Sequence, residues 1–471
     1  MPGVPSGRAC EACRQQKKKC DETTPCSRCS RLGIPCVGSG QRRFQFKDQS
    51  HRFQAAKIER SSSTHSDAEG RSSVGRVSSP PSNALTILVS GFAERVQPAT
   101  NLKYNLIWAY GGFLLQVPKR LGSNEALDAA ASCLITAHQR LIIAGGDVIP
   151  QALAKYSQAL NALRKCLDDP VEACSANTLC AVMILLMCQM FIGLEGTRYT
   201  GHCEGAAKIL KARGTRPYNP EDQFESVLLL TLRGPVLFEG LFNNRIHFTR
   251  EDWETLVQNE LDQRTGAGNM MNSLARVPPI LERGRIALRD QQEDELRNLC
   301  RETKILYDPL KAPLRVAQAN YLESAQKFRD LQSSPVQDMF SSPVMRLYGG
   351  HQRMYGLALL VQTILNGILR SLSLEHDVNL ESESDCLIKE IVSLAEDATI
   401  FRPLGSCYMG LCLVLAWAGT ADLETRLEAE RLYKEYRSDF PLSQDASLEL
   451  ASMSSQLNSY NPLLPGDSFH P

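Results

Sequence analysis

The sequence predicts a mostly α-helical protein, with a small cysteine-rich module at the N-terminal end, a disordered linker and then a large all-helical domain. Six cysteines fall within residues 10–36, the stretch 61–84 is almost free of apolar residues, and beyond it apolar residues recur at intervals of three and four. These observations divide the chain into a head (residues 1–60), a linker (residues 61–84) and a helical body (residues 85–471).

Length and composition allow a large folded domain beside the head. The chain has 471 residues, of which 43% are hydrophobic and 22% charged, an ordinary balance for globular domains. Its formal net charge of zero hides an asymmetry, because residues 1–60 contain 13 Lys or Arg against 5 Asp or Glu. A basic head on an acidic body favours a nucleic-acid-binding end attached to a part that avoids DNA.

The sequence points to a reducing compartment and to no membrane partner. Residues 1–9 are rich in Pro and Gly and lack the apolar core of a secretion signal. In a reducing compartment, clustered cysteines bind metal rather than form disulfides. The longest apolar run, residues 180–194, contains Gln189 and is short for a membrane span of about 20 residues, so we expect a buried core helix.

The cysteines of the head form a duplicated pattern. Their spacing is C-x2-C-x6-C-x5-C-x2-C-x6-C, so the halves CEACRQQKKKC and CSRCSRLGIPC repeat one geometry. Each Zn²⁺ takes four ligands in a tetrahedron, and six thiolates hold two ions only when two sulfurs bridge both metals. The alternative, a redox pair or disulfide framework, is disfavoured by the basic residues between the ligands. We therefore expect two zinc ions per chain, bound by Cys10, Cys13, Cys20, Cys26, Cys29 and Cys36.

Residues 8–37 resemble the fungal Zn2Cys6 binuclear cluster family. The segment between the second and third cysteines matches the family pattern C-R-x-x-K-x-K-C at Arg14, Lys17 and Lys19. In that family the first and fourth cysteines bridge the two zincs, which implies Cys10 and Cys26 in this chain. The resemblance also implies a sequence-specific regulator of RNA polymerase II transcription, with double-stranded DNA as its partner.

The basic residues among the ligands are the candidate DNA contacts. A helix fixed by a rigid metal core can enter the major groove, where guanine N7 and O6 accept hydrogen bonds. The resemblance implies that Lys17 reads a CGG-like triplet, with Lys18 as its neighbour in the same role. Phosphate contacts, which position a protein without specifying sequence, are expected from Arg14, Lys19, Arg28 and Arg31. For Arg28 and Arg31, a solvated surface charge remains an open alternative.

Two basic stretches favour a nuclear protein. RQQKKK at residues 14–19 lies in the cluster, and RRFQFK at residues 42–47 follows it. Such clusters serve nuclear import or contact with the DNA backbone. For the second stretch, a solvated segment leaving the module is the alternative.

The segment behind the cluster lacks a dimerisation zipper. A coiled coil needs apolar residues every three to four positions over several heptads. No leucine occurs between Leu32 and Leu85, and residues 61–84 are poor helix formers. The sequence leaves two arrangements open, a monomer on a single triplet or a homodimer through the helical body.

The body is expected to form helix after helix. One apolar face, between residues 150 and 169, is marked by Leu153, Tyr156, Leu160, Leu163 and Leu167. The acidic segment 375–385 is expected as a solvated loop, with coactivator recruitment as the alternative. Further helices are expected over 123–143, 176–194, 203–213, 222–234, 280–304, 314–332, 352–373, 384–399, 406–418 and 422–437.

The body is expected to regulate rather than catalyse. No P-loop, GxSxG, HExxH or strand-borne GxGxxG is present, so we expect no enzyme. Residues 202–214 are similar to the H-x-x-G-A-x-x-[LI]-[LI]-x-x-R-G segment of fungal regulatory regions, in which His202 is expected as a hydrogen-bonded structural residue, with a ligand contact as the alternative. The resemblance implies contacts with coregulators or the transcription machinery and control of a metabolic or secondary-metabolite gene cluster. The rival hypothesis is a helical scaffold or corepressor whose cysteine head contributes little DNA binding.

Overall fold

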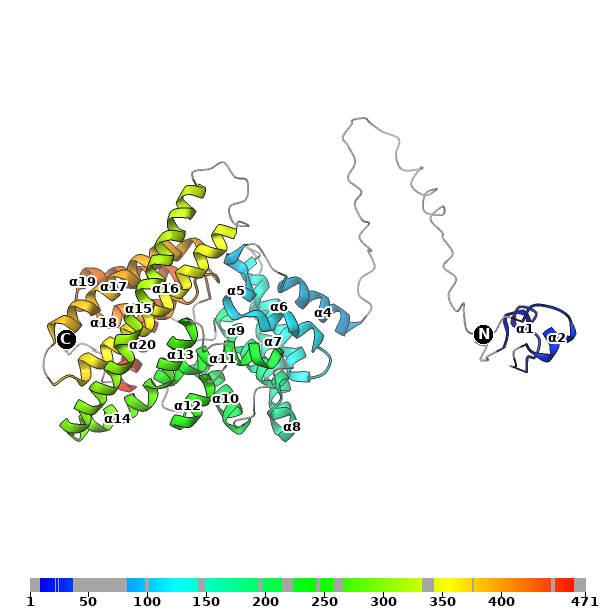
Figure 1. Ribbon diagram of the computed structural model, residues 1–471, viewed down its shortest axis with the longest axis horizontal. Coiled ribbons are helices and arrows are strands. Elements are labelled where there is room, and N and C mark those ends of the chain that lie inside the picture. Colours follow the sequence, from blue (N-terminus) through cyan, green and yellow to red (C-terminus); the bar gives the residue numbers. More distant parts are fainter. Residues whose placement is uncertain are drawn as a thin grey trace, which may run out of the picture. The chain divides into compact units, whose positions relative to one another are not determined.

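The computed structural model describes the chain in segments, which are residues 9–21, 23, 25–36, 83–97, 101–142, 149–193, 197–213, 223–242, 246–257, 266–332, 343–374, 377–441 and 445–460. The chain splits into two compact units, residues 1–79 and residues 80–471. All regular secondary structure within these segments is α-helix or 3-10 helix, which confirms the predicted mostly α fold (Figure 1). The predicted linker as far as residue 82 and the basic stretch 42–47 lie outside the described residues.

In its described residues the first unit contains two short helices, α1 (Glu11–Gln15) and α2 (Ser27–Arg31). The second unit begins with α4 (Ala84–Arg95), where the Asn83 side chain accepts a hydrogen bond from the Thr86 amide and caps the first turn. The first helix of the body therefore begins one residue before the expected start at residue 85.

The other helices of the described segments belong to the second unit. In chain order they are η1 (Leu102–Tyr104), α5 (Leu106–Tyr110), η2 (Gly112–Lys119), α6 (Glu125–Ile142), α7 (Ile149–Asp168), α8 (Pro170–Ala173), α9 (Ala176–Ile192), α10 (Thr197–Arg213), α11 (Gln223–Phe242), α12 (Arg250–Val257), α13 (Gly266–Ala275), α14 (Val277–Arg289), α15 (Glu293–Gln332), α16 (Pro343–Leu372), α17 (Val378–Ala398), η4 (Thr399–Phe401), α18 (Met409–Gly419), α19 (Leu423–Arg437) and α20 (Ala446–Tyr460).

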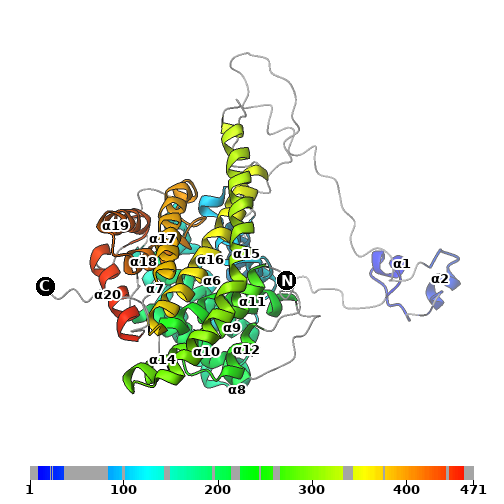
Figure 2. The same cartoon turned by 60° about the vertical axis from the view of Figure 1, so that its left-hand side comes forward.

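Two groups of helices build most of the core of the body. α6 packs against α7 and α9, while α15, α16 and α17 lie side by side and continue into α18 and α19 (Figure 2). Buried apolar side chains from both groups join in one continuous cluster. α9 is buried on nearly every side, so the core helix expected over 176–194 is confirmed. α16 is long and apolar enough to cross a bilayer, but 83% of its most apolar window is buried in the body, as in the core helix of a globular domain.

The apolar face predicted for residues 150–169 is confirmed at Tyr156 and Leu163, which are buried, but wrong at Leu160 and Leu167. α7 buries Ala152, Tyr156 and Ala159 along one face, whereas Leu160 is 38% exposed and Leu167 is 43% exposed. The alanines face the core because α7 packs against α6 and α9, where small side chains allow close approach. The prediction followed the large apolar side chains and therefore missed the alanines on the buried face of α7.

The helices predicted over 280–304 and 314–332 have different boundaries. α14 ends at Arg289 because Gln291 adopts a left-handed φ of 50°, and the Gln292 amide bonds back to the Ala287 carbonyl. α15 then runs without a break through Pro309 and Pro313. Packing along α16 offsets the amide hydrogen bonds that the two prolines cannot donate.

The acidic segment 375–385 is not the solvated loop that was expected. From residue 378 it forms the first turns of α17, with Asp377 as the N-cap. Glu383 accepts hydrogen bonds from the Tyr307 hydroxyl at 2.6 Å and from Lys311 at 2.8 Å. Part of the acidic charge therefore ties α17 to α15.

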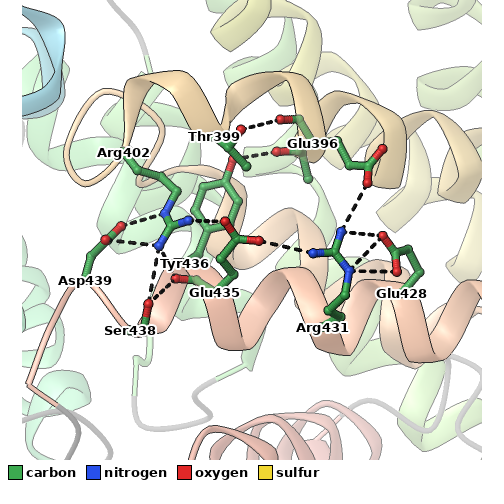
Figure 3. A network of polar contacts seen from close by, with 10 residues as sticks. Glu396, Thr399, Arg402, Glu428, Arg431, Glu435, Tyr436, Ser438 and Asp439 are labelled. Carbon is green, nitrogen blue, oxygen red and sulfur yellow. Dashed lines mark hydrogen bonds and ion pairs between the residues drawn. The ribbon is translucent and has the colours of Figure 1, made fainter.

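A polar network joins the end of α17 and η4 to α19 (Figure 3). Arg402 pairs with Asp439 at 2.8 Å and with Glu435, and its guanidinium lies 5.4 Å from the centre of the Tyr436 ring. Arg431 joins the same network through Glu435 at 3.2 Å. Bidentate and shared contacts of this kind hold helix orientation better than isolated surface pairs do.

Candidate metal centre and nucleic-acid interface

The two halves of the head (residues 10–20 and 26–36) share one backbone geometry. Each half starts with a cysteine whose sulfur caps a short helix: Cys26 Sγ accepts from the Cys29 amide at 3.4 Å, and Cys10 Sγ accepts from the Cys13 amide. The Cys10 amide donates to Cys20 Sγ at 3.5 Å, and the Cys26 amide donates to Cys36 Sγ at 3.2 Å. An offset of 16 residues therefore maps one half onto the other.

The helices of both halves end in the same kind of turn. The Lys18 amide bonds to the Cys13 carbonyl at 2.9 Å, and the Ile34 amide bonds to the Cys29 carbonyl at 3.1 Å. The residue before each donor is left-handed, with φ of 50° at Lys17 and 62° at Gly33. This is the Schellman arrangement, which favours glycine at the left-handed position. The second half has glycine there, whereas the first half has a lysine.

The six sulfurs fall into two groups of four that share two members. The groups are Cys10, Cys13, Cys20 and Cys26, and Cys10, Cys26, Cys29 and Cys36, with the sulfurs of each group all within 4.8 Å of one another. Cys10 Sγ lies 3.7 Å from Cys26 Sγ and 3.6 Å from Cys29 Sγ. A tetrahedral centre with Zn–S bonds of about 2.3 Å separates its sulfurs by about 3.8 Å. The sulfur positions therefore fit zinc.

Hydrogen bonds from backbone amides act on the two shared thiols. The Cys13 amide lowers the pKa of Cys10, and the Cys29 amide lowers the pKa of Cys26. By contrast, burial raises the pKa of Cys13 to about 11. The two sulfurs common to both groups are thus among those whose thiolate form, the form that binds metal, is stabilised by backbone amides.

The fungal Zn(2)-Cys(6) binuclear cluster domain matches residues 8–44. The head of the chain therefore carries a zinc-cluster domain of this family. No curated protein and no solved structure matches the chain. The zinc-cluster head binds zinc and DNA, and the protein is a zinc-cluster transcription factor. Members of the family are transcription factors rather than enzymes, and they are generally nuclear.

The predicted DNA contacts take different positions in the zinc-cluster head. Lys17, Lys18 and Lys19 are all exposed and form the turn that follows α1, called the basic turn below (residues 17–19). Arg31 is exposed at the end of α2. The side chain of Arg14 lies outside the described residues, although its backbone belongs to α1.

Arg28 differs from the other basic residues because it contacts the first half of the head. It is half-buried, and its Nη2 donates to Gln16 Oε1 at 2.7 Å. Its Nη1 lies 3.9 Å from Cys13 Sγ, in position to donate to that sulfur. Sequence reasoning missed Gln16, because nothing in the spacing indicates that a glutamine of one half meets an arginine of the other.

Asp21 is a second residue that sequence reasoning missed. Its carboxylate accepts a hydrogen bond from the Ser27 amide, at 3.0 Å to Oδ2, and this contact lowers the pKa of the carboxyl group. Asp21 therefore supports the start of α2 from the loop between the halves. An acidic residue a few positions before a helix start is the signal that could have found it.

His202 of the body has the structural role that was expected. Its Nε2 and the Tyr156 hydroxyl share a hydrogen bond at 2.6 Å, and the two rings meet edge to face. Burial lowers the pKa of His202 to about 4, so the ring is neutral at pH 7. The hydrogen bond ties α10 to α7.

Proposed function

We propose that this transcription factor is nuclear and reads a CGG-like triplet through Lys17 and Lys18. The observation that carries the proposal is the difference between the two equivalent turns of the head. The basic turn offers three exposed lysines, whereas its counterpart consists of Gly33, Ile34 and Pro35. Of the two turns, only the basic turn therefore has the charge to approach DNA and the donors to reach guanine N7 and O6.

The same proposal assigns the metals and the phosphate contacts. Two zinc ions bind per chain, with Cys10 and Cys26 bridging them and the other four cysteines as terminal ligands. The geometry of two sulfur groups with two shared members supports this stoichiometry. Arg14, Lys19 and Arg31 contact phosphates and fix the register of the basic turn on the duplex.

Metal counting tests the bridging assignment. Native mass spectrometry of the full chain should give two zinc ions. Cys10→Ser removes a shared thiolate and should cost both ions, whereas Cys20→Ser removes a terminal ligand of one site and should leave about one ion bound. Equal losses in the two variants, or a single ion in the unchanged chain, would contradict the assignment.

The variant Lys17→Gly tests base reading without disturbing the backbone. Glycine adopts the left-handed φ of 50° more readily than lysine, so the change removes the side chain and keeps the turn. Affinity for a duplex with a CGG triplet should fall by about 1–3 kcal/mol relative to a duplex with that triplet scrambled. Equal losses on the two duplexes would remove Lys17 as a base reader.

Arg31→Ala is the matched control for a phosphate contact. It should weaken binding to the CGG and scrambled duplexes alike, and it should lower the slope of log K against log salt by about one. Its ratio of CGG to scrambled affinity should stay unchanged. A changed ratio would move Arg31 from the phosphates to the bases.

We further propose that the body supplies regulation, through coregulator or transcription-machinery contacts or through homodimerisation. The family resemblance supports control of a metabolic or secondary-metabolite gene cluster. Deleting residues 1–60 tests the role of the head, because promoter occupancy in nuclei should then be lost. Persistent occupancy after the deletion would favour a helical scaffold or corepressor that other proteins bring to DNA.

A further inference from the structure

We propose that Arg28 is a positioning residue, which braces the basic turn from the opposite half of the head and thereby sets the specificity of Lys17. This inference rests on the proposed function of Lys17 as the base reader. It assigns Arg28 a task within the protein instead of the phosphate contact that its charge predicts.

Arg28 contacts residues that lie next to the basic turn. Gln16 follows the last residue of α1 and directly precedes Lys17. The Arg28 guanidinium holds the Gln16 side chain at 2.7 Å and reaches Cys13 Sγ at 3.9 Å. One planar cation therefore links α2 to both the metal-binding sulfur and the end of α1. Hydrogen bonds from a charged donor are about twice as strong as neutral ones.

The backbone of the basic turn has few other supports among the described residues. Lys17 is left-handed, a conformation that costs a non-glycine residue about 1 kcal/mol or more. The Lys18 amide bonds back to Cys13 at 2.9 Å, and the Gln16 amide bonds to Ala12 at 3.3 Å. A brace on the Gln16 side chain limits rotation of this strained turn, and with it the direction of the Lys17 side chain.

The repeat shows that the brace belongs to one half alone. The offset of 16 residues maps Arg28 onto Ala12 and Gln16 onto Leu32. Alanine and leucine cannot form the equivalent hydrogen bond, and Leu32 is 51% exposed. The two halves therefore differ at this point. The basic turn, with its three lysines, has the brace, whereas the equivalent turn of the second half has neither lysines nor a brace.

Lysine cannot replace arginine in this position. The guanidinium presents donors in a rigid plane, so it can serve the glutamine oxygen and the sulfur together. An ammonium is a single charge on a flexible stem. Arg28→Lys therefore keeps the charge available to DNA and removes the brace, which separates the two roles.

The test uses the full, zinc-loaded chain with Arg28→Ala, Arg28→Lys, Gln16→Ala and the double variant Arg28→Ala/Gln16→Ala. Binding to the CGG duplex and to the scrambled duplex is measured over a series of salt concentrations. Each single variant should lower the ratio of the two affinities about five- to tenfold, less than Lys17→Gly does. The double variant should lose no more than either single one, because both remove the same contact. The salt slope should not change.

Three outcomes would overturn the brace. The first is a ratio that stays unchanged while Arg28→Ala lowers the salt slope by about one, since that marks a phosphate contact. The second is a ratio of CGG to scrambled affinity in Arg28→Lys that equals the ratio of the unchanged chain. The third is a normal ratio in Gln16→Ala, and this variant also decides the matter if Arg28→Ala fails to bind zinc. Lys17→Gly is measured alongside: if it leaves the ratio unchanged the proposed base reading fails, whereas a loss confined to Lys17→Gly removes the brace alone.

Discussion

The fold of the zinc-cluster head and the fold of the helical body are stabilised by different interactions. In the described part of the head, the buried cluster consists of Cys10, Cys13, Cys26 and Cys29, with a few partly buried neighbours such as Ile34. The body has one continuous apolar core built by most of its helices. An apolar cluster of this size cannot stabilise a fold on its own, and the head therefore depends on bound metal. The body depends instead on the burial of apolar side chains. Each unit should therefore respond to a treatment that leaves the other intact.

Removal of zinc should have the largest effect and should affect the head alone. Structural zinc contributes about 10–16 kcal/mol to small metal-dependent folds, so chelation should abolish DNA binding. In the described part of the body, no group of His, Cys, Asp or Glu approaches metal-binding geometry. The helical circular dichroism and the melting temperature of the body should therefore stay the same. The control is chelator saturated with zinc. If the body melted on chelation, metal would stabilise the body as well as the head, contrary to this prediction.

A core substitution should produce the opposite pattern. Phe191 on α9 is fully buried and lies against Phe440 with ring centres 6.5 Å apart. Phe191→Ala should destabilise the body by about 3–5 kcal/mol in urea unfolding, because it leaves a cavity in the core. Zinc content and DNA affinity should not change. Leu423→Ala is the matched control, since that side chain is 67% exposed. A loss of zinc in the Phe191 variant would show that the two units are coupled.

Acidification should weaken the body through His138, which is buried, and His202, which is half-buried. Burial lowers the pKa of His138 and of His202 to about 4, against an ordinary value of about 6.5. Both rings are neutral in the folded body and take up a proton on unfolding below pH 6.5. The free energy of unfolding that depends on these neutral rings is therefore fully present above pH 6.5 and is lost as the pH falls towards 4. Between pH 7 and pH 5, each should cost about 2 kcal/mol of unfolding free energy.

Single replacements separate this effect from general acid instability. Urea unfolding at pH 7 and pH 5 should show a smaller drop for His138→Gln than for the unchanged chain. His247→Gln should keep the full drop, because His247 is exposed. An equal drop in all three proteins would contradict the assignment to His138.

The smallest expected effect compares the two halves of the head. Lys17 and Gly33 occupy equivalent left-handed positions, and glycine alone adopts such a φ without cost. Lys17→Gly should therefore stabilise the zinc-loaded head by about 1 kcal/mol relative to Lys17→Ala. Competition with a chelator measures this as about a fivefold difference in the free zinc needed. Equal zinc affinity in the two variants would contradict a strained turn.

The cysteine pattern predicted much of the head because metal geometry imposes it. Six thiolates at this spacing leave few arrangements, and the sulfurs of Cys10 and Cys26 are shared by both groups as the family implies. The contact between Arg28 and Gln16 could not be predicted, since it joins residues that meet only after both halves have folded. The left-handed backbone of Lys17 was equally hidden, because the sequence has no glycine there to mark the turn.

In the body, the sequence predicted which segments are helical better than their ends and faces. Apolar periodicity revealed α7 and a continuous apolar run revealed α9, but the core-facing side of α7 includes alanines and leaves Leu160 and Leu167 exposed. The gap predicted between residues 304 and 314 does not exist, because α15 runs through Pro309 and Pro313 and packs along α16, a contact that the local sequence does not reveal. The acidic segment before residue 385 looked solvated since its partners, Tyr307 and Lys311, lie more than 70 positions away.

Selection from a random DNA pool by the full chain, with zinc and after chelation, tests whether zinc organises the head into a reader of a short DNA sequence. With zinc, the bound fraction should become enriched in a CGG-like triplet, and Lys17→Gly should lose that enrichment. After chelation no sequence should be enriched. Enrichment that persists without zinc, or zinc-dependent binding with no enriched triplet, would contradict the account.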